Sequence, residues 1–213
     1  MEFNMINFDK RVIVCDDFFP DPHGIRDIAL ESQYEDYNIN NNYPGINSKN
    51  PFWDNNLQAI LSSITGSGVY PTPNSSCGHF RSTKKNDTSK QVIHFDPKPE
   101  QKWAGVVYLS LPKDYQDIDC GTKMYRHKKS NMSVAPFDYK QSSIIGVRTQ
   151  EDMVKFFETD GVNDSLWDVE INIPFKFNRL VLFRPWMWHG IAGQFGNSIE
   201  TSRLTQLIFL NEY

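Results

Sequence analysis

The feature that most constrains the fold is a series of short β-prone segments that starts just after Cys77. The segments are rich in β-branched and aromatic residues, and turn signals such as glycine, proline and asparagine separate them. Seven segments follow one another, at residues 78–83, 91–96, 103–111, 122–127, 167–173, 179–185 and 203–210. Many short strands in one run are typical of a β-sandwich or a double-sheet jelly roll.

The chain before Cys77 follows a different pattern. Residues 11–19 are a further β-prone run, and residues 25–32 have apolar side chains at helical spacing. Residues 52–65 predict a second helix, because their apolar residues recur at i, i+3, i+4 and i+7. Residues 34–51 are polar and rich in asparagine, which is typical of a loop.

These patterns predict one domain. Residues 128–165 interrupt the β-prone series as an insertion, with a helix expected over residues 152–159. No internal repeat and no linker rich in proline, glycine or serine divides the chain. We therefore expect a single domain over residues 1–213 that is mostly β with flanking helices (α+β). In it, residues 1–76 would support a jelly-roll core over residues 77–213.

Composition excludes several classes of protein. Hydrophobic residues make up 39% of the chain, which is enough for a packed core, and the net charge of -4 argues against a general nucleic-acid binder. Cys15, Cys77 and Cys120 have no C-x-x-C spacing, so neither a zinc ribbon nor a disulfide framework is predicted. We find no signal-peptide pattern and no apolar run of the ~20 residues that span a membrane, so we expect a cytoplasmic protein.

Candidate metal ligands lie in two separated segments. His94 and Asp96 are two residues apart in a β-prone run, and side chains at i and i+2 of a strand share a face. His189 follows a hydrophobic run that breaks at Pro185, and an imidazole in such an apolar setting needs a partner. A core histidine bonded to the backbone is the alternative. Two imidazoles and one carboxylate, with open positions, are the ligand set of non-haem Fe(II) oxygenases.

A candidate anion site lies on the last β-prone segment. Arg203 and Thr205 are two apart in an otherwise apolar run, so both side chains are expected on one face. A guanidinium and a hydroxyl that point inward call for an anionic partner such as a carboxylate. The alternative is a surface strand in which Arg203 pairs with Glu200 or Glu170.

Together these motifs resemble the Fe(II)/2-oxoglutarate-dependent oxygenases, in particular their prolyl-hydroxylase-like branch. The segments "HFDP", "WAGVVYLS", "RLVLFRPWMWHG" and "SRLTQLIFL" also resemble a little-characterised bacterial and viral group of that branch. The resemblance covers a little over half of the chain. It implies a double-stranded β-helix and a dioxygenase that hydroxylates its substrate with O2.

The resemblance also implies roles for individual residues. His94, Asp96 and His189 would be the catalytic ligands of Fe(II), and Arg203 with Thr205 would bind the far carboxylate of 2-oxoglutarate. Tyr108 would add a hydrogen bond to the cosubstrate. Two features depart from the family pattern. Arg203 follows His189 by 14 residues, which is longer than the spacing common in the family, and Cys120 stands where a glycine is expected.

Other functions stay open at this stage. A cupin-like dioxygenase or isomerase would use the same metal ligands without 2-oxoglutarate, and a jelly roll could also bind a ligand without catalysis. A zinc hydrolase is a third alternative, although no H-E-x-x-H motif supports it.

The sequence does not identify the substrate, for which an amino acid, a peptide and a small molecule are all candidates, nor does it predict the oligomeric state. We expect the loops at 34–51, 66–78 and 112–165 to determine specificity. The polar candidates near strand ends are Tyr43, Arg81, Arg126 and His127. Trp186 and Trp188 are candidates for the pocket wall, although aromatic residues beside a buried strand are more often part of the core.

Overall fold

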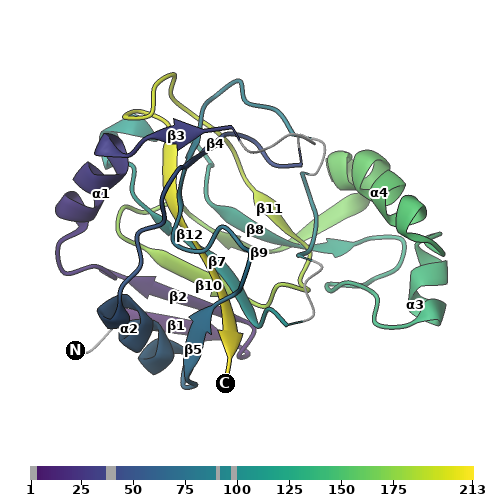
Figure 1. Ribbon diagram of the computed structural model, residues 1–213. Helices are drawn as coiled ribbons and strands as arrows, with labels where there is room; N and C mark the ends of the chain where they lie inside the picture. The colour runs from purple at the N-terminus through teal and green to yellow at the C-terminus, as the bar shows by residue number, and fades with distance from the viewer. Residues whose placement is uncertain (1–3, 37–41, 90–91, 97–99) are drawn as a thin grey trace.

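A large antiparallel sheet lies at the centre of the computed structural model, which describes residues 4–36, 42–89, 92–96 and 100–213 (Figure 1). Its strands lie in the order β1 (Asn4–Phe8), β2 (Val12–Asp16), β10 (Leu180–Phe183), β7 (Trp103–Tyr108), β12 (Arg203–Glu212), β6 (Phe80–Thr83), β4 (Ile46–Ser48) and β3 (Tyr34–Glu35). The short strand β5 (Val69–Pro71) also pairs with β12. A second antiparallel sheet contains β11 (His189–Ile191), β8 (Thr122–His127) and β9 (Trp167–Ile173).

Two helices cover one face of the large sheet. Asp21 caps the N-terminus of helix α1 (Pro22–Glu31), and Asp54 caps that of α2 (Asn55–Thr65). The carboxylate of Asp54 accepts a hydrogen bond from the Leu57 amide. The helix α2 ends at Gly66, which has φ of 73°, a left-handed conformation that glycine adopts without steric cost. The apolar faces of both helices pack in one cluster with alternate residues of the sheet strands, which places the main core between helices and sheet.

The other face of the large sheet points toward the second sheet. Strand alternation divides β12 cleanly: Leu204 and Ile208 join the core under the helices, while Arg203 and Thr205 point to the opposite side. Side chains of both sheets form a second apolar cluster there, which includes Val181 and Met124. Because this cluster fills only part of the space between the sheets, the rest stays open as a cavity.

The insertion between β8 and β9 carries its own hydrophobic cluster. It contains α3 (Tyr139–Ile144) and α4 (Gln150–Thr159), followed by the 3-10 turns η2 (Asp160–Val162) and η3 (Asp164–Leu166); a further turn, η1 (Pro112–Asp114), follows β7. The two helices lie at the side of the molecule, beyond the second sheet (Figure 1). Phe156 and Phe157 of α4 pack against Ile93 and Trp188, so the insertion supports the segments that carry His94 and His189.

The mostly β fold with flanking helices is confirmed, and two local predictions are wrong. Residues 92–96 form no strand beyond a single bridge from His94 to His189. The pairing does not continue, because the amide of Asp96 bonds to the carbonyl of Pro185. Gln91 and Pro97, which were expected to begin and end this strand, lie outside the described residues. The polar segment 34–51 is not a continuous loop, because β3 and β4 extend the large sheet at its edge.

The cysteines and the helices bear on two further expectations. Cys15, Cys77 and Cys120 are buried free thiols. Within the described part of the chain, no helix combines the length and the apolar character that a membrane span requires.

Candidate metal centre

Backbone pairing brings the three candidate metal ligands together. His94 and His189 exchange two backbone hydrogen bonds, of 3.0 and 2.8 Å, which places them directly opposite one another. Opposite residues of an antiparallel pair share a face, and the two imidazole centroids are accordingly 4.5 Å apart. The amide of Asp96 donates to the carbonyl of Pro185 at 2.8 Å, and this bond holds the carboxylate beside the imidazoles.

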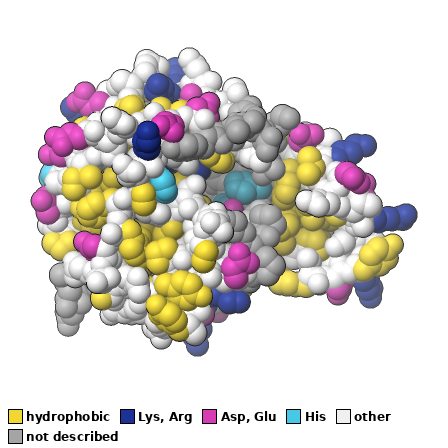
Figure 2. All heavy atoms as spheres, in the orientation of Figure 1, with side chains coloured by type: hydrophobic (Ala, Val, Ile, Leu, Met, Phe, Trp, Pro, Cys, Tyr) yellow, Lys and Arg dark blue, Asp and Glu magenta, His cyan; other side chains and the backbone are white. Residues whose placement is uncertain are grey.

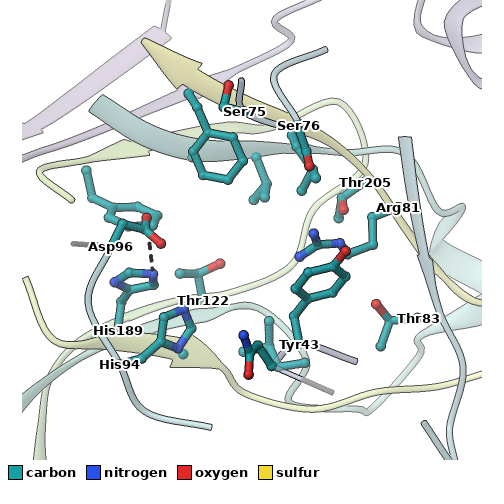
Figure 3. Close-up of a pocket in the computed structure, with 18 of the residues that line it drawn as sticks. Tyr43, Ser75, Ser76, Arg81, Thr83, His94, Asp96, Thr122, His189 and Thr205 are labelled. Atoms are coloured by element: carbon teal, nitrogen blue, oxygen red, sulfur yellow. Dashed lines mark ion pairs between the residues drawn. The ribbon is translucent and has the colours of Figure 1, made fainter. Parts of the chain in front are cut away.

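The three side chains can reach one ion. Each of His94, Asp96 and His189 offers one ligand atom, and these atoms all lie within 4.8 Å of one another. Asp96 Oδ2 is 3.9 Å from His189 Nε2. Figure 3 shows all three side chains at one end of the cavity, pointing toward its interior. The set is therefore close enough to bind a divalent cation from one side.

Hydrogen bonding and burial prepare both imidazoles for metal binding. His189 Nδ1 lies 2.9 Å from the carbonyl oxygen of Met187, so Nδ1 carries the proton and Nε2 presents a lone pair to the site. Burial, and to a smaller extent the neighbouring His189, lower the pKa of His94 to about 3. His94 is therefore neutral at pH 7, and its buried Nδ1 has no hydrogen-bond partner among the described residues.

The metal ligands line a cavity of about 330 Å³, which is the size of a small-molecule site. Arg81, Thr122, Arg203 and Thr205 contribute polar groups to its wall, and apolar residues such as Phe209 line the rest. Figure 3 shows Arg81 at the side opposite to the histidines. On the face shown in Figure 2, a histidine side chain is visible inside a hollow between the body of the molecule and the part that carries α3 and α4.

Arg203 is buried in the cavity wall and has no acidic partner among the described residues. It is 3% exposed; its Nε donates to the carbonyl of Cys120 at 3.1 Å and its Nη2 to that of Gly121 at 3.4 Å. Burial lowers the pKa of Arg203. The surface-strand alternative is wrong, because Glu170 pairs with Arg126 instead. Arg203 is thus a buried cation that faces a cavity.

Thr205 and Tyr108 occupy different positions relative to the cavity. Thr205 lines the wall, and its buried hydroxyl has no hydrogen-bond partner in the described part of the chain. Tyr108 is fully buried behind the wall, where its hydroxyl lies 2.6 Å from the hydroxyl of Thr122 and its ring stacks on Phe175. A contact between Tyr108 and a cosubstrate stays a prediction; Thr122 is the residue that reaches the cavity.

The structure divides the remaining polar candidates. Tyr43 and Arg81 line the cavity. Arg126 does not, since it pairs with Glu170 on the outer side of the second sheet. His127 is buried away from the cavity, with Nδ1 2.9 Å from Ser130 Oγ.

Trp186 and Trp188 are not among the lining residues of the cavity. Trp188 instead packs in the cluster under α4. The sequence did not point to Thr122, which lines the cavity, or to Asn47, which accepts a hydrogen bond from Arg81. The inward position of Thr122 on an alternating strand was a usable signal, whereas Asn47 stands in a polar segment with no pattern.

Comparisons with known proteins agree with the fold. The crystal structure of HygX from Streptomyces hygroscopicus, with nickel and 2-oxoglutarate bound, matches with a TM-score of 0.52 and 10% sequence identity, over 96% of this chain and 84% of that chain. At this identity the likeness concerns the fold alone, and it supports the expected jelly roll. No curated protein matches the chain significantly. The model of DUF6445, a family of unknown function, matches residues 2–210, and the chain therefore belongs to that family.

Proposed function

We propose that the protein is an Fe(II)- and 2-oxoglutarate-dependent dioxygenase of the prolyl-hydroxylase-like branch. The observation that carries this proposal is that one cavity contains both His94, Asp96 and His189, with ligand atoms within 4.8 Å of one another, and a buried arginine, Arg203, without an acidic partner among the described residues. The nickel and 2-oxoglutarate bound to HygX, which shares the fold, support it. Its substrate is an amino acid, a peptide or a small molecule.

The residues at the site fit a ferrous ion. Two imidazoles and one carboxylate match the ligand set of non-haem Fe(II) enzymes. The set contains no sulfur ligand, which Cu(I) prefers. The hydrogen bond from His189 Nδ1 to Met187 directs the second ring nitrogen at the ion. Because all three ligands lie at one end of the cavity, they would hold the ion from one side.

The other wall residues would bind and orient the cosubstrate. Arg203 would pair with the far carboxylate of 2-oxoglutarate, and the Thr205 hydroxyl would donate a further hydrogen bond to it. Phe183, Leu207 and Phe209 would exclude water from the region between this carboxylate and the metal ligands. When bound, Fe(II), 2-oxoglutarate and O2 supply the oxidation of a C–H bond, coupled to decarboxylation of the cosubstrate to succinate and CO2.

Anaerobic titration with Fe(II) and 2-oxoglutarate tests the proposal. We expect a weak visible charge-transfer band in the wild type and its loss in Asp96→Ala, with Asp168→Ala, an exposed carboxylate on β9, as the matched control. Admission of O2 should then release succinate from the wild type and from Asp168→Ala, but not from Asp96→Ala. Absence of the band in the wild type refutes the proposal and favours a non-catalytic module.

A second variant separates the cosubstrate from the metal. Arg203→Gln should weaken 2-oxoglutarate binding while metal binding, followed with Mn(II), persists. If 2-oxoglutarate binds this variant as tightly as the wild type and no succinate forms, a cupin-like enzyme that does not use 2-oxoglutarate is the better assignment.

A further inference from the structure

The cavity contains a second arginine that the proposed chemistry does not use. Arg81 on β6 lies directly opposite Thr205 on β12, and Arg203 lies opposite Thr83. The two arginines are therefore diagonal neighbours on adjacent strands, with both side chains on the cavity face. Burial is the largest cause that lowers the pKa of Arg81, to about 10, and the neighbouring Arg203 acts in the same direction. The proximity of the two cations therefore costs stability unless anions lie between them.

Arg81 is held in one orientation by its neighbours. Its Nε donates to Asn47 Oδ1 at 2.8 Å, and its guanidinium carbon lies 3.8 Å from the centroid of the Tyr43 ring. Stacking on an aromatic ring covers one face of the guanidinium, and a side-chain hydrogen bond with Tyr43 adds to this contact. A ligand would approach along the edge of the guanidinium. No carboxylate of the described residues lies within 4.0 Å of the Arg81 guanidinium. The geometry is that of an anion-binding fork fixed before the anion arrives.

The charges in the cavity leave room for one more negative charge. Among the residues that line it, Arg81 and Arg203 are the cations and Asp96 is the only acidic side chain in the described part of the wall. Addition of a ferrous ion and the 2-oxoglutarate dianion leaves one positive charge uncompensated. A monoanionic substrate would neutralise it, whereas a phosphate ester, with about -1.5 to -2 charges, would overcompensate.

The two arginines are also anchored on opposite sides. Arg203 donates to Cys120 and Gly121, next to the second sheet, and Arg81 donates to Asn47 on β4. The negative charge of Asp96 acts on Arg81, whose pKa it raises against the larger effect of burial. Figure 3 shows the Arg81 guanidinium across the cavity from the three metal ligands. A substrate bound to Arg81 would place its reacting part on the side of these ligands.

We infer that Arg81 is the specificity-determining residue of this site and that it binds a carboxylate of the primary substrate. The substrate class is then a small monocarboxylic acid that carries no compensating cation, or the C-terminus of a peptide. The planar fork of an arginine matches a carboxylate with two parallel hydrogen bonds. The inference rests on the proposed function for the reaction, but the carboxylate site itself requires only Arg81 and its neighbours.

Matched acids and amides test this inference. The anaerobic protein with Fe(II) and saturating 2-oxoglutarate is titrated with glycine, acetate and benzoate, and with glycinamide, acetamide and benzamide, while its melting temperature is followed. We expect at least one carboxylate to raise the melting temperature and its amide to have no effect, since only the charge and one donor group differ. Equal shifts for acid and amide, or no shift with any acid, overturn the inference, and this comparison needs no variant.

Variants then locate the binding residue. Arg81→Gln should weaken carboxylate binding by about tenfold or more, because a charge-assisted pair is lost. The midpoint of the 2-oxoglutarate titration should stay within about twofold of the wild type. Arg184→Gln is the matched control: Arg184 also stacks on an aromatic ring, 3.7 Å from the Trp103 centroid, but it lies outside the cavity. Arg81→Lys keeps the charge if the glutamine variant does not fold, and it too should weaken binding.

The outcomes separate this inference from the proposed function. If Arg81→Gln retains carboxylate binding, the inference is wrong. It is also wrong if Arg81→Gln weakens 2-oxoglutarate binding as strongly as Arg203→Gln does, because both arginines then bind one carboxylate of the cosubstrate. If no charge-transfer band forms in the wild type but carboxylates still bind in an Arg81-dependent way, the dioxygenase proposal fails and the carboxylate site stands.

Discussion

Replacement of Thr205 by valine should change stability and cosubstrate binding in opposite directions. Thr205 is fully buried, and its hydroxyl has no hydrogen-bond partner among the described residues. A buried unpaired hydroxyl costs about 1–3 kcal/mol. Valine has the same shape and an equal preference for strands, so Thr205→Val removes this cost without a cavity. The melting temperature of the free protein should rise by about 2–4 °C for each kcal/mol gained.

The same substitution should weaken 2-oxoglutarate. A hydrogen bond to a charged group contributes about 1.5–3 kcal/mol, so loss of the hydroxyl predicts a dissociation constant roughly 10- to 100-fold higher. Thermal unfolding of the free protein and anaerobic titration of the charge-transfer band measure the two effects on one sample. A purely structural hydroxyl cannot produce both.

Thr83→Val is the matched control for this experiment. Thr83 lies in the same wall and is 1% exposed, but its hydroxyl donates to the carbonyl of Pro44 at 3.3 Å. Its replacement should therefore lower the melting temperature. A Thr205→Val protein that melts below the wild type refutes the assignment of an unpaired hydroxyl, and an unchanged 2-oxoglutarate midpoint refutes its role in binding.

Three further predictions concern stability. The pKa of Asp16 is lowered chiefly by its hydrogen bond with Arg179, so this carboxylate stabilises the fold above its unfolded pKa of about 3.9, and the contribution is lost as pH falls through the folded value. Asp16→Asn should cost about 1–3 kcal/mol at pH 7 in urea unfolding, and the difference from wild type should shrink towards pH 2. A methyl group on Gly121 would overlap the carbonyl oxygen of Ile173, which is backbone and cannot yield, so Gly121→Ala should lower the melting temperature by several degrees; an unchanged value would contradict this packing. Mn(II) at 100 times its dissociation constant should stabilise the wild type by about 2.7 kcal/mol, EDTA should reverse the effect, and Asp96→Ala should abolish it.

The regular elements could be predicted because their signals are local. The helix α2 has apolar residues at the spacing of one face and a left-handed glycine at its end, and the strands β7, β10 and β12 are β-prone runs bounded by turns. The strands β3 and β4 could not be predicted from their polar sequences. They exist because β6 offers backbone hydrogen-bonding groups to β4, and β4 in turn offers them to β3; such pairing does not require apolar side chains.

The candidate site divides along the same line. The order and chemistry of His94, Asp96, His189 and Arg203 are present in the sequence as motifs, and they were sufficient to predict a metal site and an anion site. How the ligands approach one another could not be predicted. It depends on a single bridge between His94 and His189, which are 95 residues apart in the sequence, and on the insertion with α4 that packs behind this bridge. The predicted roles of these residues in binding stay predictions.

Alternation along strands and helices by itself determined which residues could face inward, because side-chain direction follows from backbone geometry alone. Only the tertiary structure decided what each inward residue meets. It placed Tyr108 behind Thr122, moved Trp188 into the core under α4, and set Arg81 beside Arg203 in one cavity. Contacts of this kind depend on the relative position of distant strands, and no local pattern in the chain encodes that distance.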